Sequence, residues 1–424
     1  MLRHRRKIVI LAIVFSIFRL GLSFGTNPSL EMNIDEERSW QIAAHHVAGR
    51  GYVFFDPYVN DYIPTALHAS TPGFIYECLI RAGISKEAWV VAIYALIATA
   101  LGLSIYFFYR LTLFFFEEDY SLAATVVYCM LPSSLFWVSR IFYYENLVMP
   151  LLVITAYLLI QSLKQGAKPA AAVMIPVLAI VSISLRNQAA FSFCLMLAAF
   201  AVIALMRRRG SLMIPVAVAA MGVVGISIPA LIKNHELFGA YILSNQSGYE
   251  MLQGHNPLAK GGWNGSWRDP GDPLYDYAHQ NIADLDGMDE YEESKARQSL
   301  AMSFIREQPL ADLRLEIKKM ALFFAPFDFP GLTPPMFDVL LLVIYVPFLL
   351  MVVLKVWRRE ISGEDIIMFA PIVGSIALTI LFFMGPRWRY YAEPFMIVYA
   401  VLCIKNVSRL FSLEPTNAGV HEAA

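Results

Sequence analysis

The sequence predicts an all-α protein that crosses a membrane about ten times, and three observations lead to this fold class. The chain of 424 residues is 58% hydrophobic and only 16% charged, whereas soluble domains carry about 25% charged residues. The apolar residues gather in blocks of roughly 17–23 residues, the length that a helix needs to cross the bilayer core. Lysine and arginine cluster between these blocks in a regular alternation.

The predicted spans follow one another along the chain, so residues 1–424 are expected to form a single membrane domain. The first apolar block comes after a basic N-terminus and lacks a cleavage-site pattern, so we expect it to stay as a helix. The spans are predicted at residues 8–24, 88–109, 120–138, 145–163, 169–186, 189–206, 211–233, 336–357, 365–385 and 390–411.

The basic clusters predict the orientation of these spans. Ten spans bring all of the clusters to one side of the membrane, and the positive-inside rule makes that side the cytoplasm. Both termini are then cytoplasmic, in a multi-pass protein of the cell (inner) membrane. The clusters are Arg3–Lys7, Lys164 with Lys168, Arg207–Arg209, Lys355 with Arg358 and Arg359, and Lys405 with Arg409.

Two long segments, 25–87 and 234–335, are predicted to lie outside. Both mix aromatic residues, glycine, proline and charges, whereas a disordered linker is poor in aromatic residues. We therefore expect ordered segments, with an amphipathic helix over 36–48 and another helix over 292–308 that ends before Pro309.

Composition argues against several function classes. The net charge of −1 gives no basic character that would suggest a nucleic-acid partner. The four cysteines include no CxxC pair, which argues against a disulfide framework and a structural zinc site. No internal repeat is visible, which argues against a transporter built from duplicated halves.

Three outer acids are candidates for chemistry. Asp35 and Glu36 begin the helix predicted over 36–48, where Asn33 can act as the N-cap; they are either ordinary first-turn acids or a general base for an acceptor hydroxyl. Glu145 begins the fourth span, and a structural pair with Arg140 is the simpler interpretation.

Four arginines at the outer ends of helices oppose the positive-inside trend: Arg140, Arg186, Arg387 and Arg389. Each one either pairs with an acid or a lipid headgroup, or belongs to a phosphate clamp, because a guanidinium matches phosphate oxygens two bonds at a time. His255 and Asn256 lie in a glycine-rich loop over 248–267, which reads either as tight turns or as a loop that closes over a sugar.

Taken together, these motifs resemble the GT-C glycosyltransferases, in particular the branch with protein O-mannosyltransferases and lipid A aminoarabinose transferases. The resemblance runs from about residue 8 to about residue 411 and departs from the family at Gln41, Lys233 and His255. The motifs that carry it are Asp35-Glu36 with Trp40 and Gly51-Tyr52, Thr71–Tyr76, Ser139–Asn146, Leu185-Arg186-Asn187, the loop from Asn234 to Gly262, and Arg387-Trp388-Arg389-Tyr390 with Glu393-Pro394-Phe395.

This resemblance implies a GT-C-like fold and an inverting transfer of a sugar from a polyprenyl-phosphate donor to a glycan, lipid or protein acceptor. By analogy Asp35 is the base, with Glu36 beside it, and the arginines hold the phosphate of the carrier. Membrane lipid is the expected surrounding. No cofactor is expected. The resemblance leaves a divalent metal open, because some relatives require one, but the lack of a dense group of carboxylates favours no metal.

Two rival functions remain at this point. A ligase or polymerase of lipid-linked glycans handles the same kind of carrier. A transporter or flippase is not an enzyme, and it places ionisable residues at the middle of the membrane. The predicted spans are nearly free of such residues, with Arg19 as the main exception.

Overall fold

A computed structural model of the chain describes residues 4–56, 61–66, 70–131, 133, 144–166, 168–263, 265, 269–325 and 335–411. These residues are mostly helical, in agreement with the predicted all-α class, and they include one small antiparallel hairpin, β1 (Val53–Asp56) with β2 (Asp61–Pro64). Arg140 lies outside these ranges.

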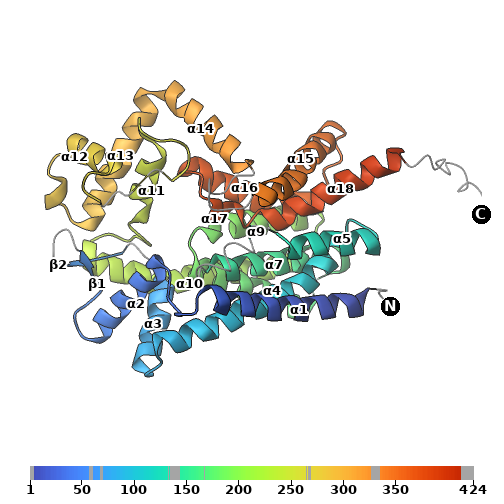
Figure 1. The fold of residues 1–424 in the computed structure, drawn as a ribbon, viewed down its shortest axis with the longest axis horizontal. Coiled ribbons are helices and arrows are strands. Elements are labelled where there is room, and N and C mark those ends of the chain that lie inside the picture. Colours follow the sequence, from blue (N-terminus) through green and yellow to red (C-terminus); the bar gives the residue numbers. More distant parts are fainter. Residues whose placement is uncertain are drawn as a thin grey trace, which may run out of the picture.

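The apolar bundle and the outer elements alternate along the chain (Figure 1). The helices of the bundle are α1 (Arg5–Thr26), α4 (Lys86–Thr112), α5 (Glu118–Cys129), α7 (Glu145–Gln165), α8 (Pro169–Leu185), α9 (Ala189–Met206), α10 (Met213–Phe238) after the short η1 (Gly210–Leu212), α15 (Pro335–Trp357), α16 (Gly363–Leu381) and α18 (Glu393–Phe411). The outer helices are α2 (Ile34–Val47), α3 (Ser70–Arg81), α11 (Gln246–Gly254), α12 (Pro273–Asn281), η2 (Leu285–Gly287), α13 (Glu290–Glu307), α14 (Pro309–Phe323) and α17 (Pro386–Arg389).

Among the described residues, six helices are long and apolar enough to cross a membrane. They are α1, α4, α7, α9, α10 together with η1, and α16. α8 and the part Leu341–Trp357 of α15 are apolar but shorter, and α5 ends at Cys129 within the span predicted over 120–138. The chain is thus a multi-pass membrane protein, and the number of ten spans stays a prediction.

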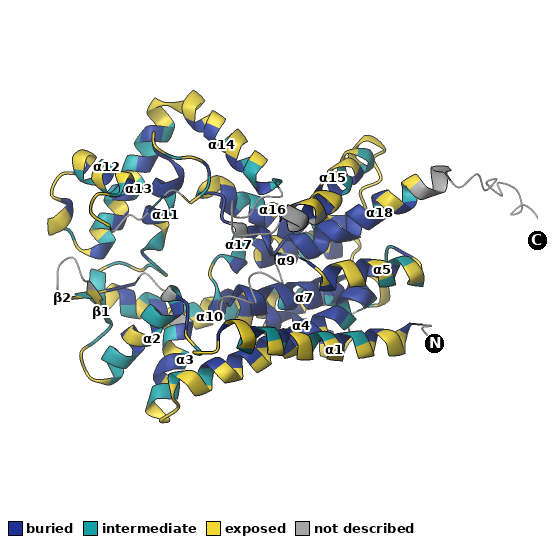
Figure 2. Ribbon diagram, in the orientation of Figure 1, coloured by how far each residue is buried: buried dark blue, intermediate teal, exposed yellow. Residues whose placement is uncertain are grey.

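The outer faces of α1 and α10 need apolar surroundings. Only 17% of the apolar stretch of each is buried within the protein. Large aliphatic side chains such as Ile17, which is 66% exposed, and Val224, which is 64% exposed, lie on these faces. Figure 2 shows such exposed residues repeating along α1, at the edge of the bundle. Contiguous apolar surface of this kind is unfavourable in water and is expected against lipid.

α7 forms the centre of the bundle. Its apolar stretch is 89% buried, and it packs against α4, α8, α9 and α16. The other closely packed helix pairs of the bundle are α9 with α16, α8 with α10, α1 with α4, and α15 with α18. Because α7 begins at Glu145, this central packing fixes the position of one candidate acid.

Basic residues and acids join the helices at the end of the bundle where α1 begins and α18 ends (Figure 1). The side of the membrane on which this end lies stays a prediction. The ion pairs are His4–Asp119 at 2.8 Å, Lys405–Glu117, Arg207–Glu364 at 3.5 Å and Lys355–Asp365 at 2.9 Å.

The two segments predicted to lie outside contact each other at the opposite end of the bundle. The carboxylate of Glu290, at the start of α13, accepts hydrogen bonds from the backbone N–H of Ala66 at 2.8 Å and from the side chain of Asn245 at 2.9 Å. Asn245 also donates its backbone N–H to the carbonyl of Ala66 at 3.2 Å. The first outer segment is therefore bound to the second, above the bundle.

Labelling of cysteines tests the predicted orientation. Cys78 of α3 is exposed, and Glu360, after α15, is exposed at the basic end. In a background in which the other three cysteines are replaced by serine, Cys78 should react with an impermeant maleimide in intact cells. With Cys78 also replaced, a Glu360→Cys variant should react only after the membrane is permeabilised. The reverse pattern would contradict the assignment of the basic end to the cytoplasm.

Candidate functional site

The first turn of α2 holds two of the predicted acids in a fixed direction. As predicted, Asn33 is the N-cap: its side-chain oxygen accepts the backbone N–H of Asp35 at 2.8 Å and that of Glu36 at 3.1 Å. Successive residues of a helix point in different directions. Glu36 is therefore turned into the protein, with 2% of its surface exposed, while the side chain of Asp35 remains 29% exposed.

Glu36 lies in a buried polar pocket between three segments. The hydroxyl of Tyr76, on α3, donates to Glu36 Oε2 at 2.7 Å, and Tyr76 is in turn 2.8 Å from the hydroxyl of Tyr144. Arg186 Nη2 donates to Glu36 Oε1 at 3.3 Å. Burial raises the pKa of Glu36 to about 7, and the charge of Arg186 and the Tyr76 hydrogen bond oppose this rise.

Arg186 connects Glu36 to the start of the central helix. It follows the last turn of α8, and its Nε donates to Glu145 Oε2 at 3.1 Å. Burial alone would lower the pKa of Arg186, but Glu145, Glu36 and Asp35 raise it above its ordinary value. Arg186 is therefore a permanent cation among three carboxylates.

Arg387 completes the group from the far end of the sequence. Its Nη1 is 3.3 Å from Asp35 Oδ2 and 3.9 Å from Glu145 Oε1. We refer to Asp35, Glu36, Glu145, Arg186 and Arg387 as the acid–arginine cluster. Five of the residues predicted from the sequence thus lie together, although they belong to α2, α7, the end of α8 and α17.

The glycine-rich loop holds the segment that carries Arg387. A Cβ at Gly254 would lie 1.4 Å from the carbonyl oxygen of Phe382, so only glycine permits this close approach. Gly261 accepts the backbone N–H of Met384 at 2.8 Å. The turns in this loop therefore position the backbone of the segment just before Arg387.

A cavity of about 350 Å³ opens beside the cluster. Arg186 belongs to both, and the cavity lies between the start of α9, the end of α16 and the helix α11. Its lining combines polar and aromatic side chains and includes Asn187, Gln188, Phe191, Gln246, Ser247, Glu250 and Phe382.

Glu250 was not anticipated from the sequence. It lies on α11 and lines the cavity, and Gln246 donates to its Oε1 at 2.8 Å. Burial raises its pKa to about 7 against the opposing charge of Arg387, and Asp35 adds to the rise. One signal was available: Glu250 is the only acid between residues 237 and 268.

His255 and Asn256 lie just after α11, and the hydrogen bonds of Asn256 are local. Asn256 is 1% exposed; it donates to the carbonyl of Leu252 at 2.6 Å and accepts the backbone N–H of Leu258 at 2.7 Å. This is the hydrogen bonding of a tight turn. The role in a substrate loop that we predicted for these residues stays a prediction.

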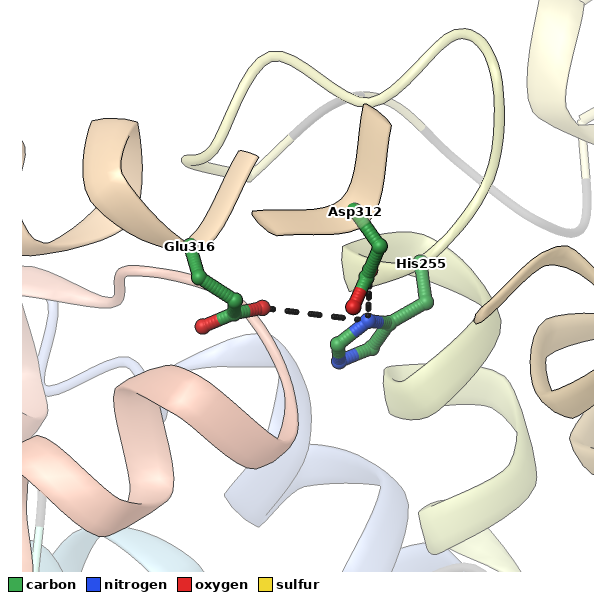
Figure 3. A group of neighbouring side chains, drawn as sticks. All are labelled: His255, Asp312 and Glu316. Atoms are coloured by element: carbon green, nitrogen blue, oxygen red, sulfur yellow. Dashed lines mark hydrogen bonds and ion pairs between the residues drawn. The ribbon is translucent and has the colours of Figure 1, made fainter. Parts of the chain in front are cut away.

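Figure 3 shows His255 with Asp312 and Glu316 of α14. His255 Nδ1 is 2.8 Å from Asp312 Oδ1 and 3.8 Å from Glu316 Oε1. Lys319, with a fully buried side chain, lies 2.7 Å from Glu316 Oε1 and 3.2 Å from His255 Nε2. It also donates to the carbonyl of Ile380 at 3.2 Å, and so joins α14 to α16.

This group contains the donor types of a metal site but fits one poorly. One atom from each of His255, Asp312 and Glu316 lies within 4.8 Å of the others, and imidazole and carboxylate both bind divalent ions. However, the ammonium of Lys319 already neutralises Glu316 and contacts the imidazole, so an added ion would face a buried cation. The arrangement fits a structural network that connects α11, α14 and α16.

Arg389 differs from Arg387 in its surroundings. It is 0% exposed, and its guanidinium donates to the carbonyls of Phe323 at 3.2 Å and Ala325 at 2.7 Å. Its Nε is 3.3 Å from the buried carboxylate of Glu393. Phosphate binding by Arg389 stays a prediction, and Arg140 lies outside the described residues.

The chain matches no family model, and no curated protein sequence is significantly similar to it.

Proposed function

We propose that the protein is a membrane glycosyltransferase, which moves a sugar from a polyprenyl-phosphate donor to an acceptor on the outer face of the membrane. The acid–arginine cluster carries this proposal. Three carboxylates and two guanidinium groups from four distant segments meet at the outer end of an apolar bundle, beside a cavity of about 350 Å³. An ion pair that only stabilises the fold does not require an adjacent cavity, so the cavity favours a binding site for a ligand.

The two arginines suit the phosphate of the donor. Arg186 and Arg387 both contact Glu145, at 3.1 and 3.9 Å, so their guanidinium groups face a common space. A charge-assisted hydrogen bond to a phosphate is shorter and stronger than a neutral one. Since the cluster lies where the bundle meets the outer elements, a polyprenyl chain can stay in the bilayer while its phosphate reaches these arginines.

Asp35 suits the role of general base. It is the most exposed of the three acids in the cluster, so an acceptor hydroxyl can approach it from outside. In the proposed step, Asp35 takes the hydroxyl proton while the acceptor oxygen bonds to the anomeric carbon. The bond from that carbon to the phosphate oxygen breaks, and the polyprenyl phosphate leaves with the electron pair towards Arg186 and Arg387.

The direct test is sugar transfer by the purified protein in nanodiscs. Short-chain polyprenyl phosphates that carry radiolabelled sugars serve as donors, with a membrane extract as the source of acceptors. Release of free polyprenyl phosphate together with a labelled product supports the proposal. Protein that neither binds the phosphate carrier nor releases it from any donor would overturn it.

Binding of the donor should depend on pH through Glu36. With the pKa of Glu36 near 7, this group is mostly neutral at pH 6 and mostly ionised at pH 8. The added negative charge then opposes the phosphate, so donor binding should weaken as pH rises through about 7. A sugar-loaded carrier is a suitable probe, because its phosphodiester keeps one charge over this range. Because the pKa of Glu250 is also raised to about 7, Glu36→Gln should reduce the pH dependence of donor binding, and the double variant with Glu250→Gln should abolish it. An unchanged profile in Glu36→Gln would contradict the assignment.

A further inference from the structure

The cavity next to the acid–arginine cluster has two kinds of wall. α11 and the residues before it contribute the polar side chains Ser244, Gln246, Ser247 and Glu250, whereas the start of α9 and the end of α16 contribute Phe191 and Phe382. Polar groups together with aromatic surface suit a sugar ring, because its hydroxyl groups form hydrogen bonds while its C–H groups pack on aromatic rings.

The size and the position of the cavity suit the sugar ring of the donor. At about 350 Å³ it lies at the small end of the range of ligand sites, about 300–1,000 Å³, which fits one ring better than a longer glycan. Arg186 lines the cavity and also contacts Glu36 and Glu145. A group attached to a phosphate on Arg186 therefore extends into this cavity.

We propose that the cavity holds the sugar ring of the donor and that Glu250 makes it selective for neutral and amino sugars over acidic ones. This inference rests on the proposed function and names the class of sugar.

The surroundings of Glu250 support this selectivity. Gln246 holds Glu250 Oε1 at 2.8 Å, which keeps the carboxyl group on the cavity wall. Burial disfavours the charge of Glu250 and raises its pKa to about 7, so a second carboxylate from a uronic acid would be strongly unfavourable there. A hydroxyl group can donate to this carboxylate, and an ammonium group can pair with it.

The experiment compares the affinities of bare and sugar-loaded carriers for the purified protein at pH 8, where Glu250 is ionised. The bare probe is the methyl ester of a short-chain polyprenyl phosphate, a phosphodiester with the same single charge as a sugar-loaded carrier. The other probes are the same carrier with a neutral hexose, an amino sugar or a uronic acid. Wild-type protein should bind the hexose and amino-sugar carriers about tenfold or more tighter than the bare carrier, because one charge-assisted hydrogen bond changes affinity by about 10–100-fold. It should bind the uronic acid carrier no tighter than the bare one.

Two variants separate the contributions of charge and space. Glu250→Gln should lose about tenfold or more for the amino-sugar carrier and gain affinity for the uronic acid carrier. Ser247→Phe fills the cavity and should abolish the advantage of every sugar while the bare carrier binds as before. The control, Glu307→Gln, makes the same charge change at an exposed residue of α13 and should behave like wild type.

The outcomes distinguish this inference from the proposed function. If Glu250→Gln keeps the wild-type order of sugars, or if Ser247→Phe keeps the advantage of the sugar-loaded carriers, the inference is wrong while carrier binding still stands. If wild-type protein does not bind the bare carrier at all, the proposed function fails and the inference fails with it.

Discussion

Asp35→Asn is expected to lower sugar transfer by about 10²–10⁴-fold, the usual contribution of a general base. Asparagine keeps the shape of the side chain and does not disturb Asn33, whose side chain caps α2 through the backbone N–H groups of residues 35 and 36. It cannot take a proton, so the acceptor hydroxyl stays a weak nucleophile. The measurement is the transfer rate of purified protein, with the donor affinity determined separately.

Donor affinity should change by only a few-fold in this variant, because the phosphate is held by Arg186 and Arg387. Glu36→Gln provides the matched control, because it makes the same chemical change at the neighbouring residue, which is buried and accepts a hydrogen bond from Tyr76. It should lower the rate of sugar transfer less than Asp35→Asn does. Near-normal transfer by Asp35→Asn, in protein with an unchanged unfolding temperature, would contradict the role of general base. Asp35 would then be an ordinary acid in the first turn of α2.

Arg387→Ala is expected to weaken donor binding by about 10–100-fold, since a charge-assisted hydrogen bond contributes about 1.5–3 kcal/mol. Its side chain is 33% exposed, so the truncation should leave the fold intact. Arg387→Lys should restore part of the affinity, because lysine keeps the charge but lacks the planar fork. Binding of short-chain polyprenyl phosphate to the purified protein measures this effect.

Arg389→Ala is the matched comparison two residues away. Arg389 is fully buried against Glu393, and removing one partner of a buried pair costs about 3–5 kcal/mol of stability. This variant should therefore unfold at a lower temperature, whereas Arg387→Ala should not. If Arg387→Ala binds the carrier as well as wild type, the clamp depends on Arg186 alone or lies elsewhere.

Much of the fold follows from periodic patterns in the sequence. The helices predicted over 36–48 and 292–308 are present as Ile34–Val47 and Glu290–Glu307, because capping residues and an amphipathic pattern are local signals. Pro309, predicted to end a helix, also begins the next one, since proline is well tolerated in the first helical turn. The hairpin β1–β2 was missed because its strands are short and stabilised by pairing with each other.

The candidate site could be predicted residue by residue but not as an arrangement. Glu145, Arg186 and Arg387 each stood out as a charge at the predicted outer end of an apolar block, and Asp35 stood out as an acid at the start of a predicted amphipathic helix. The sequence favoured Arg140, which lies outside the described residues, as the partner of Glu145; the pairing of Glu145 with Arg186 was not foreseen. Arg387 and Arg389 looked equivalent in the sequence. Tertiary packing distinguishes them, because it leaves Arg387 partly exposed and buries Arg389. Glu250 was missed because its isolation among non-acidic residues does not show that tertiary packing places it beside a cavity.

The contact between Asp35 and Arg387 also has a consequence for biosynthesis. These two residues are 352 positions apart, so at about 5–20 residues per second the ribosome needs roughly 20–70 s to proceed from one to the other. Arg186 can join Glu36 and Glu145 well before that, as soon as α8 enters the membrane. The contacts of Arg186 with Glu36 and Glu145 can therefore form first in the nascent chain. The contact of Arg387 with Asp35 can form only near the end of translation. A chain that stops before residue 387 can insert most of its helices without ever completing the site.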